Sequence, residues 1–177
     1  TLSIILKEAI ANIGENINLR RFEKYTTDGF LQGYIHMGGK IGVIVELDAE
    51  YSEDNENVAK DIAMHIAASN PDYLTREDVD ADLISKEKEI YKEQMLNEGK
   101  PEHIIDNIVK GKLEKFYSQI CLLEQEFVKD TDKIVGQVLD EAGLEVKDYS
   151  RFELGEGIEK KNEDFAEEVM REVNKNK

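Results

Sequence analysis

The residues with the clearest chemical suggestion are Gly38, Gly39 and Lys40, which stand just before an aliphatic run. A loop that cradles nucleotide phosphates needs Gly, four residues, Gly-Lys and then Ser or Thr, placed between a strand and a helix. Here Gly33 stands one residue too far from Gly39, and Ile41 replaces the hydroxyl that would hold Mg²⁺. The residues that follow alternate as in a strand. We therefore expect a β-hairpin whose glycines supply positive φ, and no phosphate loop.

The three histidines do not form a metal-binding pattern. His36, His65 and His103 have no cysteine nearby and no histidine partner four residues away on a helix, so a zinc site is not expected. We expect His65 to pack on the apolar face of its helix and His103 to be solvated. His36 ends a strand at a hairpin tip beside Met37, and exposed loop residues on a rigid scaffold often carry binding. His36 is therefore a candidate contact with a partner.

The remaining reactive side chains suggest no catalytic arrangement. Cys121 is the single cysteine and has no neighbouring base, which predicts a small, reduced apolar residue. The carboxylates are too numerous to be sorted into an acid–base pair. We expect no cofactor. One cysteine excludes an internal disulfide and favours a reducing compartment, which we take to be the cytoplasm.

The candidate residues are positioned by predicted elements in the first half of the chain. Alternation of apolar residues around Met-Gly-Gly indicates strands, and three consecutive strands with short turns predict an antiparallel meander. A proline ends the helix that follows, because the residue before proline avoids the helical region. The predicted elements are a helix over 2–11, strands over 17–25, 30–36 and 40–47, a polar connection over 48–57, and a helix from Val58 that ends before Pro71.

The second half of the chain is richer in charged, helix-like segments. Two amphipathic helices within 75–121, separated by Gly-Lys-Pro at 99–101, predict an antiparallel helical hairpin. Its apolar stripe is narrow, so we expect it to project. The predicted elements after it are a helix between a Thr131 N-cap and a Gly143 C-cap, a strand from Val146, and a terminal amphipathic helix over 163–173. This order predicts an α+β fold with a small antiparallel sheet packed with helices.

Composition limits the possible partners. The chain has 177 residues and a formal net charge of −16, which disfavours nucleic acid and favours a basic protein surface. No apolar run approaches the roughly 20 residues of a membrane helix, and the first residues lack the pattern of a signal peptide. Because the chain starts without Met, we expect residue 1 to lie inside a longer protein. The residues alone indicate a protein–protein interaction module, with a self-associating acidic scaffold as the alternative.

Several segments together resemble bacterial-type elongation factor Ts. Their order and spacing match the family and they cover essentially the whole chain, although no single stretch would be specific. The matching segments are 13–23, 33–47, 59–74, 97–117, 133–139 and 151–169. The family's N-terminal helical domain and the Thr-Asp-Phe-Val signature of its first core subdomain are absent. The chain therefore resembles the C-terminal portion of such a factor.

The resemblance implies a division of the chain. The family has two related core subdomains, each with an antiparallel sheet, a helical hairpin that protrudes from the second, and a C-terminal module. The implied parts are the end of the first subdomain at 1–15, the second subdomain at 16–74 and 122–161, the hairpin insertion at 75–121 and the C-terminal helical module at 162–177.

The resemblance also implies residues that contact a partner. His36 matches the histidine of a glycine-rich family segment that contacts the nucleotide domain of elongation factor Tu. Its neighbours Tyr34, Met37, Gly38 and Gly39 are implied with it. The C-terminal module of the family packs against a helix of the same domain, and the alternative is that it docks on its own sheet. The residues of this module are Phe165, Ala166, Val169 and Met170.

The function implied by the resemblance is guanine-nucleotide exchange on elongation factor Tu. The factor promotes GDP release by binding the nucleotide-free partner, so it is not an enzyme, and GDP, GTP and Mg²⁺ belong to the partner. No contact with nucleic acid or membrane is implied. Because the Thr-Asp-Phe-Val region is missing, the alternative is a docking or dimerisation fragment that binds elongation factor Tu without efficient exchange.

Overall fold

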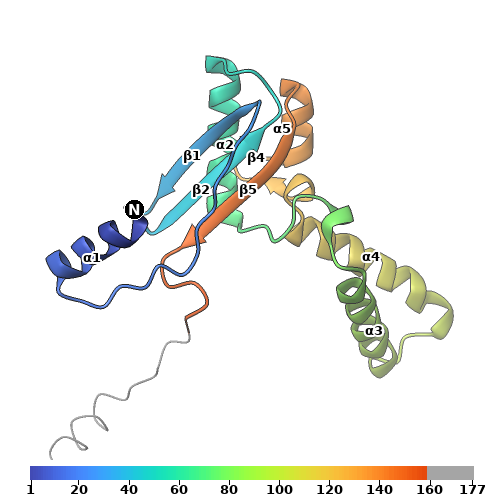
Figure 1. The fold of residues 1–177 in the computed structure, drawn as a ribbon. Coiled ribbons are helices and arrows are strands. Elements are labelled where there is room, and N and C mark those ends of the chain that lie inside the picture. The colour runs from blue at the N-terminus through green and yellow to red at the C-terminus, as the bar shows by residue number, and fades with distance from the viewer. Residues whose placement is uncertain (159–177) are drawn as a thin grey trace, which may run out of the picture.

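The computed structural model describes residues 1–158, and their fold is α+β, as predicted (Figure 1). Its centre is an antiparallel sheet in the order β1 (Phe30–His36), β2 (Ile41–Leu47) and β5 (Val146–Glu153). Helix α2 (Glu53–Ser69) covers one face of this sheet, and α5 (Val135–Ala142) packs beside it. The short strands β3 (Glu126–Phe127) and β4 (Asp130–Ile134) form a second, two-stranded sheet.

The main core lies between the sheet and α2. On β2, the predicted alternation is confirmed, because Ile41, Val43, Val45 and Leu47 are all buried. Facing them, Ile62 and Ile66 of α2 are fully buried, and Ala63 between them is buried as well. Each fully buried aliphatic side chain contributes about 1.5–3 kcal/mol to folding. This packing fixes the sheet that carries the β1–β2 turn.

Helix α2 begins earlier than the sequence pattern suggested. The polar stretch before Val58 was expected to be a connection, but the helix already starts at Glu53. The side chain of Ser52 accepts a hydrogen bond from the backbone N–H of Asn55 at 3.1 Å, and the first turn is acidic. Both features stabilise a helix N-terminus. Asn70, with φ at 47°, ends the helix just before Pro71.

The predicted first strand of the meander is wrong. Residues 17–25 form an irregular segment, and the third strand of the sheet is instead β5 from the far end of the chain. The segment is tied down by side chains: Arg20 donates to the carbonyl of Glu156 at 2.6 Å, and Tyr25 shares a 2.6 Å hydrogen bond with Ser150. Leu19 and other apolar residues here stay exposed, so strand pairing would have gained little burial.

The predicted N-cap at Thr131 is also wrong. Residues 130–134 form β4, and α5 starts only at Val135. The side chain of Gln137 accepts the backbone N–H of Ile134 at 3.0 Å, which satisfies a donor at the helix start. Pairing of β4 with β3 removes Thr131 from the helix. Gly143, with φ at 65°, ends α5 as expected.

The projecting helical hairpin is confirmed. Helices α3 (Ala81–Asn97) and α4 (Glu102–Ile120) pack against each other and extend away from the sheet (Figure 1). They bury a small cluster of their own, in which Met95, Ile105 and Val109 are the most buried residues. In residues 1–158, no residue belongs both to this cluster and to the main core. The hairpin therefore has its own internal packing.

Helix α1 (Leu2–Ile13) extends the predicted N-terminal helix by one half-turn and ends at Gly14, which has φ at 79°. None of its side chains is buried within the described part of the chain. No helix in residues 1–158 combines the length and apolar character that crossing a membrane requires.

Candidate functional site

The candidate site is the turn between β1 and β2. The last pair of the ladder joins His36 and Ile41, and the N–H of Gly39 donates to the carbonyl of His36 at 3.1 Å. Met37 and Gly38 both have positive φ, 50° and 66°. Gly39 follows with φ at 94°, so the loop of residues 37–40 reverses the chain through three consecutive residues at positive φ. The expectation that glycines shape this turn is confirmed.

Met37 is conformationally unusual. It is one of two non-glycine residues with positive φ among residues 1–158, and the other, Asn70, ends a helix. Residues with a Cβ pay roughly 1–2 kcal/mol in the left-handed region. The Met37 side chain is 61% exposed at the apex of the turn. Strained residues that persist in a well-packed frame are concentrated at functional sites.

The side chain of His36 is held by Tyr34. The two rings stack with centroids 5.8 Å apart and an angle of 26° between their planes. The Tyr34 hydroxyl and Nδ1 of His36 share a hydrogen bond of 3.1 Å. This contact leaves Nε2 of the imidazole for another partner. The turn therefore presents one oriented imidazole next to one exposed thioether.

Cationic side chains border the turn on one side. An open cavity of about 430 Å³ begins at Gly39 and Lys40 and reaches Arg20 and Arg21. Arg21 pairs with Glu156 at 2.6 Å and places its guanidinium 5.0 Å from the centre of the Phe152 ring. In a chain with a net charge of −16, this side of the turn is locally less acidic. The cavity holds no buried polar side chain built to bind a ligand.

The face of the sheet opposite α2 was missed as a candidate surface. Ile35 is 70% exposed, and its side chain lies over Gly42. A Cβ atom added to Gly42 would lie 3.5 Å from Cδ1 of Ile35. Together with Ile44 and Phe152 it borders an apolar cavity of about 340 Å³. The signal was present in the sequence, because Ile44 stands opposite in phase to the buried residues of β2. We call Leu31, Ile35, Ile44 and Phe152 the outer sheet face.

The other histidines behave as expected. His65 is fully buried, and its Nδ1 accepts the N–H of Val128 at 3.3 Å. Its Nε2–H therefore donates to Oε1 of Gln125 at 2.9 Å. Burial lowers the pKa of His65, although the hydrogen bond to Gln125 opposes this. His103 is exposed.

Cys121 is fully buried, and burial raises the pKa of its thiol to about 11. A thiol that stays protonated is a poor nucleophile. In residues 1–158, no group of three or more His, Cys, Asp or Glu side chains could hold a metal ion.

The structure brings Tyr34, His36, Met37, Gly38 and Gly39 together at one turn. The second predicted set of contact residues lies outside the described residues. These are Phe165, Ala166, Val169 and Met170 of the predicted terminal helix.

Comparison with known proteins points to one family. The family model described as Elongation factor TS matches residues 1–156. Elongation factor Ts of Halothermothrix orenii is 68% identical over 174 residues, which cover 98% of this chain and 58% of that protein. The Clostridium perfringens protein of the same name is 50% identical over 97% of this chain and 59% of its own length. A Clostridium botulinum relative is 48% identical over 99% of this chain and 60% of its own length. The chain thus spans about three fifths of these relatives.

Proposed function

Because the chain belongs to the elongation factor Ts family, we propose that it acts in translation elongation as a guanine-nucleotide exchange factor for elongation factor Tu in the cytoplasm. Nucleotide exchange makes and breaks no covalent bond, so the chain is not an enzyme in that sense. GDP, GTP and Mg²⁺ are bound by the partner only. The proposal requires no cofactor and no contact with nucleic acid or membrane.

Exchange follows from differential binding. A factor that binds the nucleotide-free partner more tightly than the nucleotide-bound partner must weaken nucleotide binding by the same factor. Each ~1.4 kcal/mol of difference is tenfold, so about 4 kcal/mol weakens nucleotide binding roughly a thousandfold. The contact residues must therefore fit a partner conformation that the nucleotide disfavours.

The observation that carries the proposal is the turn of residues 36–39. Its backbone is fixed by the β1–β2 ladder, and Tyr34 restricts the imidazole of His36. A preorganised contact loses little conformational entropy on binding. Met37, held at the apex, is the most prominent apolar side chain of the turn. Insertion of His36 and Met37 against the nucleotide domain of the partner would favour the nucleotide-free form of the partner.

A stopped-flow measurement tests the proposal. Elongation factor Tu loaded with fluorescent GDP is mixed with the chain, and the rate of GDP release is recorded. We expect faster release, a smaller effect for His36→Ala, and an unchanged effect for the matched control His103→Ala, which alters an exposed histidine on the hairpin. His36→Ala should keep the melting temperature within a few degrees, as surface changes usually do. No acceleration by the unaltered chain would refute exchange by this portion.

The outer sheet face favours a second candidate function, a docking or dimerisation fragment. Leu31, Ile35 and Ile44 lie side by side and expose apolar side chains, which a globular protein normally buries. Contiguous exposed apolar surface marks interaction sites. In this case the chain binds elongation factor Tu without efficient acceleration of GDP release, and its outer sheet face pairs with a second copy of the chain.

Binding and self-association measured beside the exchange assay separate the two candidates. Tight binding to elongation factor Tu without faster GDP release supports the second. Sedimentation should then show a dimer that Ile44→Lys disrupts, while Val128→Lys, at a residue with similar exposure elsewhere, does not. A monomer that accelerates release supports the first candidate.

The proposed domain division is part of the same proposal. The division treats 16–74 with 122–161 as one subdomain, 75–121 as an insertion, and 1–15 and 162–177 as flanking parts. It is supported by the two clusters of buried side chains, one between the sheet and α2 and one inside the hairpin.

A further inference from the structure

The α3/α4 hairpin joins the rest of the domain through a narrow neck. Residues 72–74 enter the hairpin beside residues 120–123, which leave it. The N–H groups of Asp72 and Tyr73 donate to the carbonyl of Ile120 at 2.9 and 3.0 Å. The N–H of Leu122 donates back to the carbonyl of Tyr73 at 2.8 Å. Because the hairpin and the main core share no buried residue in the described chain, the direction of the hairpin depends on this neck.

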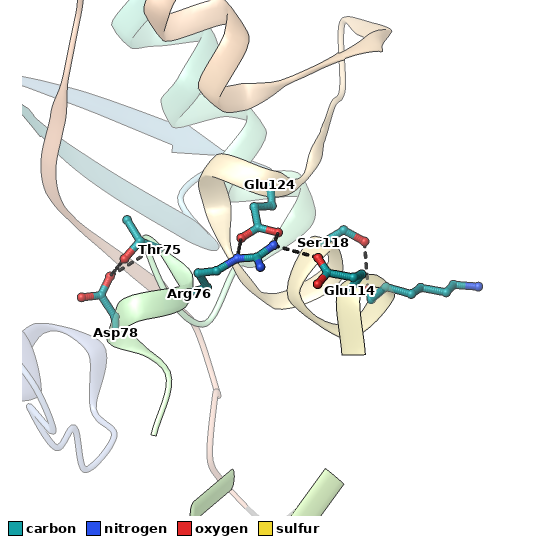
Figure 2. A network of polar contacts seen from close by, with 7 residues as sticks. Thr75, Arg76, Asp78, Glu114, Ser118 and Glu124 are labelled. Carbon is teal, nitrogen blue, oxygen red and sulfur yellow. Dashed lines mark hydrogen bonds and ion pairs between the residues drawn. The ribbon is translucent and has the colours of Figure 1, made fainter. Parts of the chain in front are cut away.

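One side chain connects the two sides of the neck (Figure 2). Arg76 lies in the short helix η1 (Arg76–Asp78), and its Nε and Nη2 donate to Oε1 and Oε2 of Glu124, both at 2.6 Å. Glu124 ends η2 (Leu122–Glu124), whose first residue, Leu122, is fully buried in the main core. This two-point contact fixes Arg76 to the core side.

The same guanidinium also contacts the hairpin. Nη2 of Arg76 donates to Oε2 of Glu114 at 3.1 Å, and the guanidinium carbon lies 4.6 Å from the centre of the Tyr117 ring. Glu114 and Tyr117 both belong to α4. The guanidinium thus hydrogen-bonds to Glu124 of η2 and to Glu114 of α4, and it lies over the Tyr117 ring of α4.

The backbone that carries Arg76 is itself braced. The N–H and the hydroxyl of Thr75 both donate to Oδ2 of Asp78, each at 2.8 Å (Figure 2). The Asp78 carboxylate thus reaches back to the backbone N–H that precedes η1, as the third helical residue does in a capping box, and it closes the single turn of η1. The position from which Arg76 reaches across the neck is therefore set locally.

We propose that Arg76 is a positioning residue that fixes the angle between the α3/α4 hairpin and the sheet domain. With 19 residues, α4 is about 28 Å long. A swing of about 15° at the neck would therefore move the hairpin tip by roughly 7 Å. Such a displacement is large compared with the tolerance of a protein contact. If the chain acts on elongation factor Tu as proposed above, this angle decides where the hairpin lies relative to the partner that the turn of residues 36–39 contacts.

Lysine cannot replace arginine in this role. The Glu124 contact uses two N–H groups of one guanidinium, and the carbon of the same guanidinium lies 4.6 Å from the centre of the Tyr117 ring. An ammonium keeps the charge but makes neither a fork nor a flat stack. Arg76→Lys therefore separates geometry from charge.

Spin-label distance measurement on the chain alone tests the proposal. Labels are attached at Lys100→Cys in the hairpin turn and at Asn57→Cys in α2, both exposed, while the buried Cys121 stays unlabelled. Distance distributions are compared for the parent, Arg76→Lys and Arg76→Gln. The matched control is Lys133→Gln, which removes an ion pair of 2.6 Å at similarly exposed side chains within the sheet domain.

We expect a narrow distribution for the parent and for Lys133→Gln, and a distribution broadened by about 7 Å for both Arg76 variants, with helical circular dichroism unchanged. Parent-like distributions in folded Arg76 variants would overturn the proposal. Broadening accompanied by loss of helical signal in both variants would also overturn it, because Arg76 would then serve to fold the hairpin. If only Arg76→Gln loses helical signal, the distance distribution of Arg76→Lys decides between the outcomes. The test uses no partner, so its outcome is independent of the exchange assay.

Discussion

Replacing Met37 by asparagine should stabilise the chain and weaken its binding to elongation factor Tu. Met37 occupies the left-handed region with φ at 50°, followed by Gly38 at 66°. Asparagine is found at positive φ several times more often than most non-glycine residues. The substitution therefore removes backbone strain and, at the same time, the exposed thioether of the proposed contact.

The expected gain can be worked out from the structure. A residue with a Cβ loses roughly 1–2 kcal/mol in the left-handed region, and asparagine tolerates this region better than most residues. Met37 is 61% exposed, so its side chain gives up little burial when it is replaced. Part of the remaining burial is already present in the unfolded chain. We therefore expect a net gain of about 0.5–1 kcal/mol, or roughly 1–4 °C in melting temperature for a domain of this size.

The assay pairs urea unfolding with a binding titration against nucleotide-free elongation factor Tu. The matched control is Met37→Ala. Alanine also removes the thioether, but it lacks the tolerance of positive φ that asparagine has. Met37→Ala should therefore lose binding as Met37→Asn does, without gaining stability.

Two results would refute the reasoning. If Met37→Asn is no more stable than Met37→Ala, the left-handed backbone at position 37 stores no strain. If Met37→Asn is more stable and binds as tightly as the parent, the exposed thioether is not a contact, and the strain serves only the turn.

Three further outcomes are expected. Gly29→Ala should cost about 2 kcal/mol or more in urea unfolding, because its Cβ would lie 1.9 Å from the carbonyl oxygen of Leu47, whereas Gly33→Ala, with open space around its Cβ, should cost less than about 1 kcal/mol. Burial lowers the pKa of His65 below its unfolded value of about 6.5, so the unfolded chain binds the proton more readily. The contribution of neutral His65 to stability is then present above pH ~6.5 and is lost as the pH falls through the folded pKa. The free energy of unfolding of the parent should therefore fall by up to ~1.4 kcal/mol per pH unit more than that of His65→Gln. Equal slopes of unfolding free energy against pH would contradict this. Cys121, fully buried with its pKa raised to about 11, should react with a thiol reagent only after urea is added.

The parts of the fold that were predictable are those that local patterns decide. Alternation in β2 and helical periodicity in α3 and α4 follow from which residues are apolar, and Gly143 ends α5 because glycine takes positive φ without strain. The parts that failed depend on distant partners. Residues 17–25 have strand-like composition, but they contact the edge strand β5 through side chains such as Tyr25 and leave Leu19 exposed. Residues 130–134 leave the predicted helix because β3 offers a pairing partner.

The candidate site divides in the same way. The position of His36 at a hairpin tip could be predicted from the glycines that follow it. The stacking of Tyr34 on His36 could be expected only from their shared face, two residues apart on one strand. The left-handed conformation of Met37 carries no sequence signal of its own, because methionine is not a typical residue at positive φ. The phase of Ile44 marks the outer sheet face in the sequence, but the exposure of this face depends on the fact that no element in residues 1–158 fully covers it.

The neck of the hairpin has a consequence for the order of folding. Strand β5 must pair with β2 across a chain segment of about a hundred residues, since Leu47 lies opposite Val146. The α3/α4 hairpin forms from contacts local in sequence, and its neck joins residues 72–74 to 120–123. Once it has formed, the loop that β5 must close is about half as long. Halving a loop lowers its closure entropy cost by about 0.6 kcal/mol. Early formation of the α3/α4 hairpin therefore favours pairing of β5 with β2.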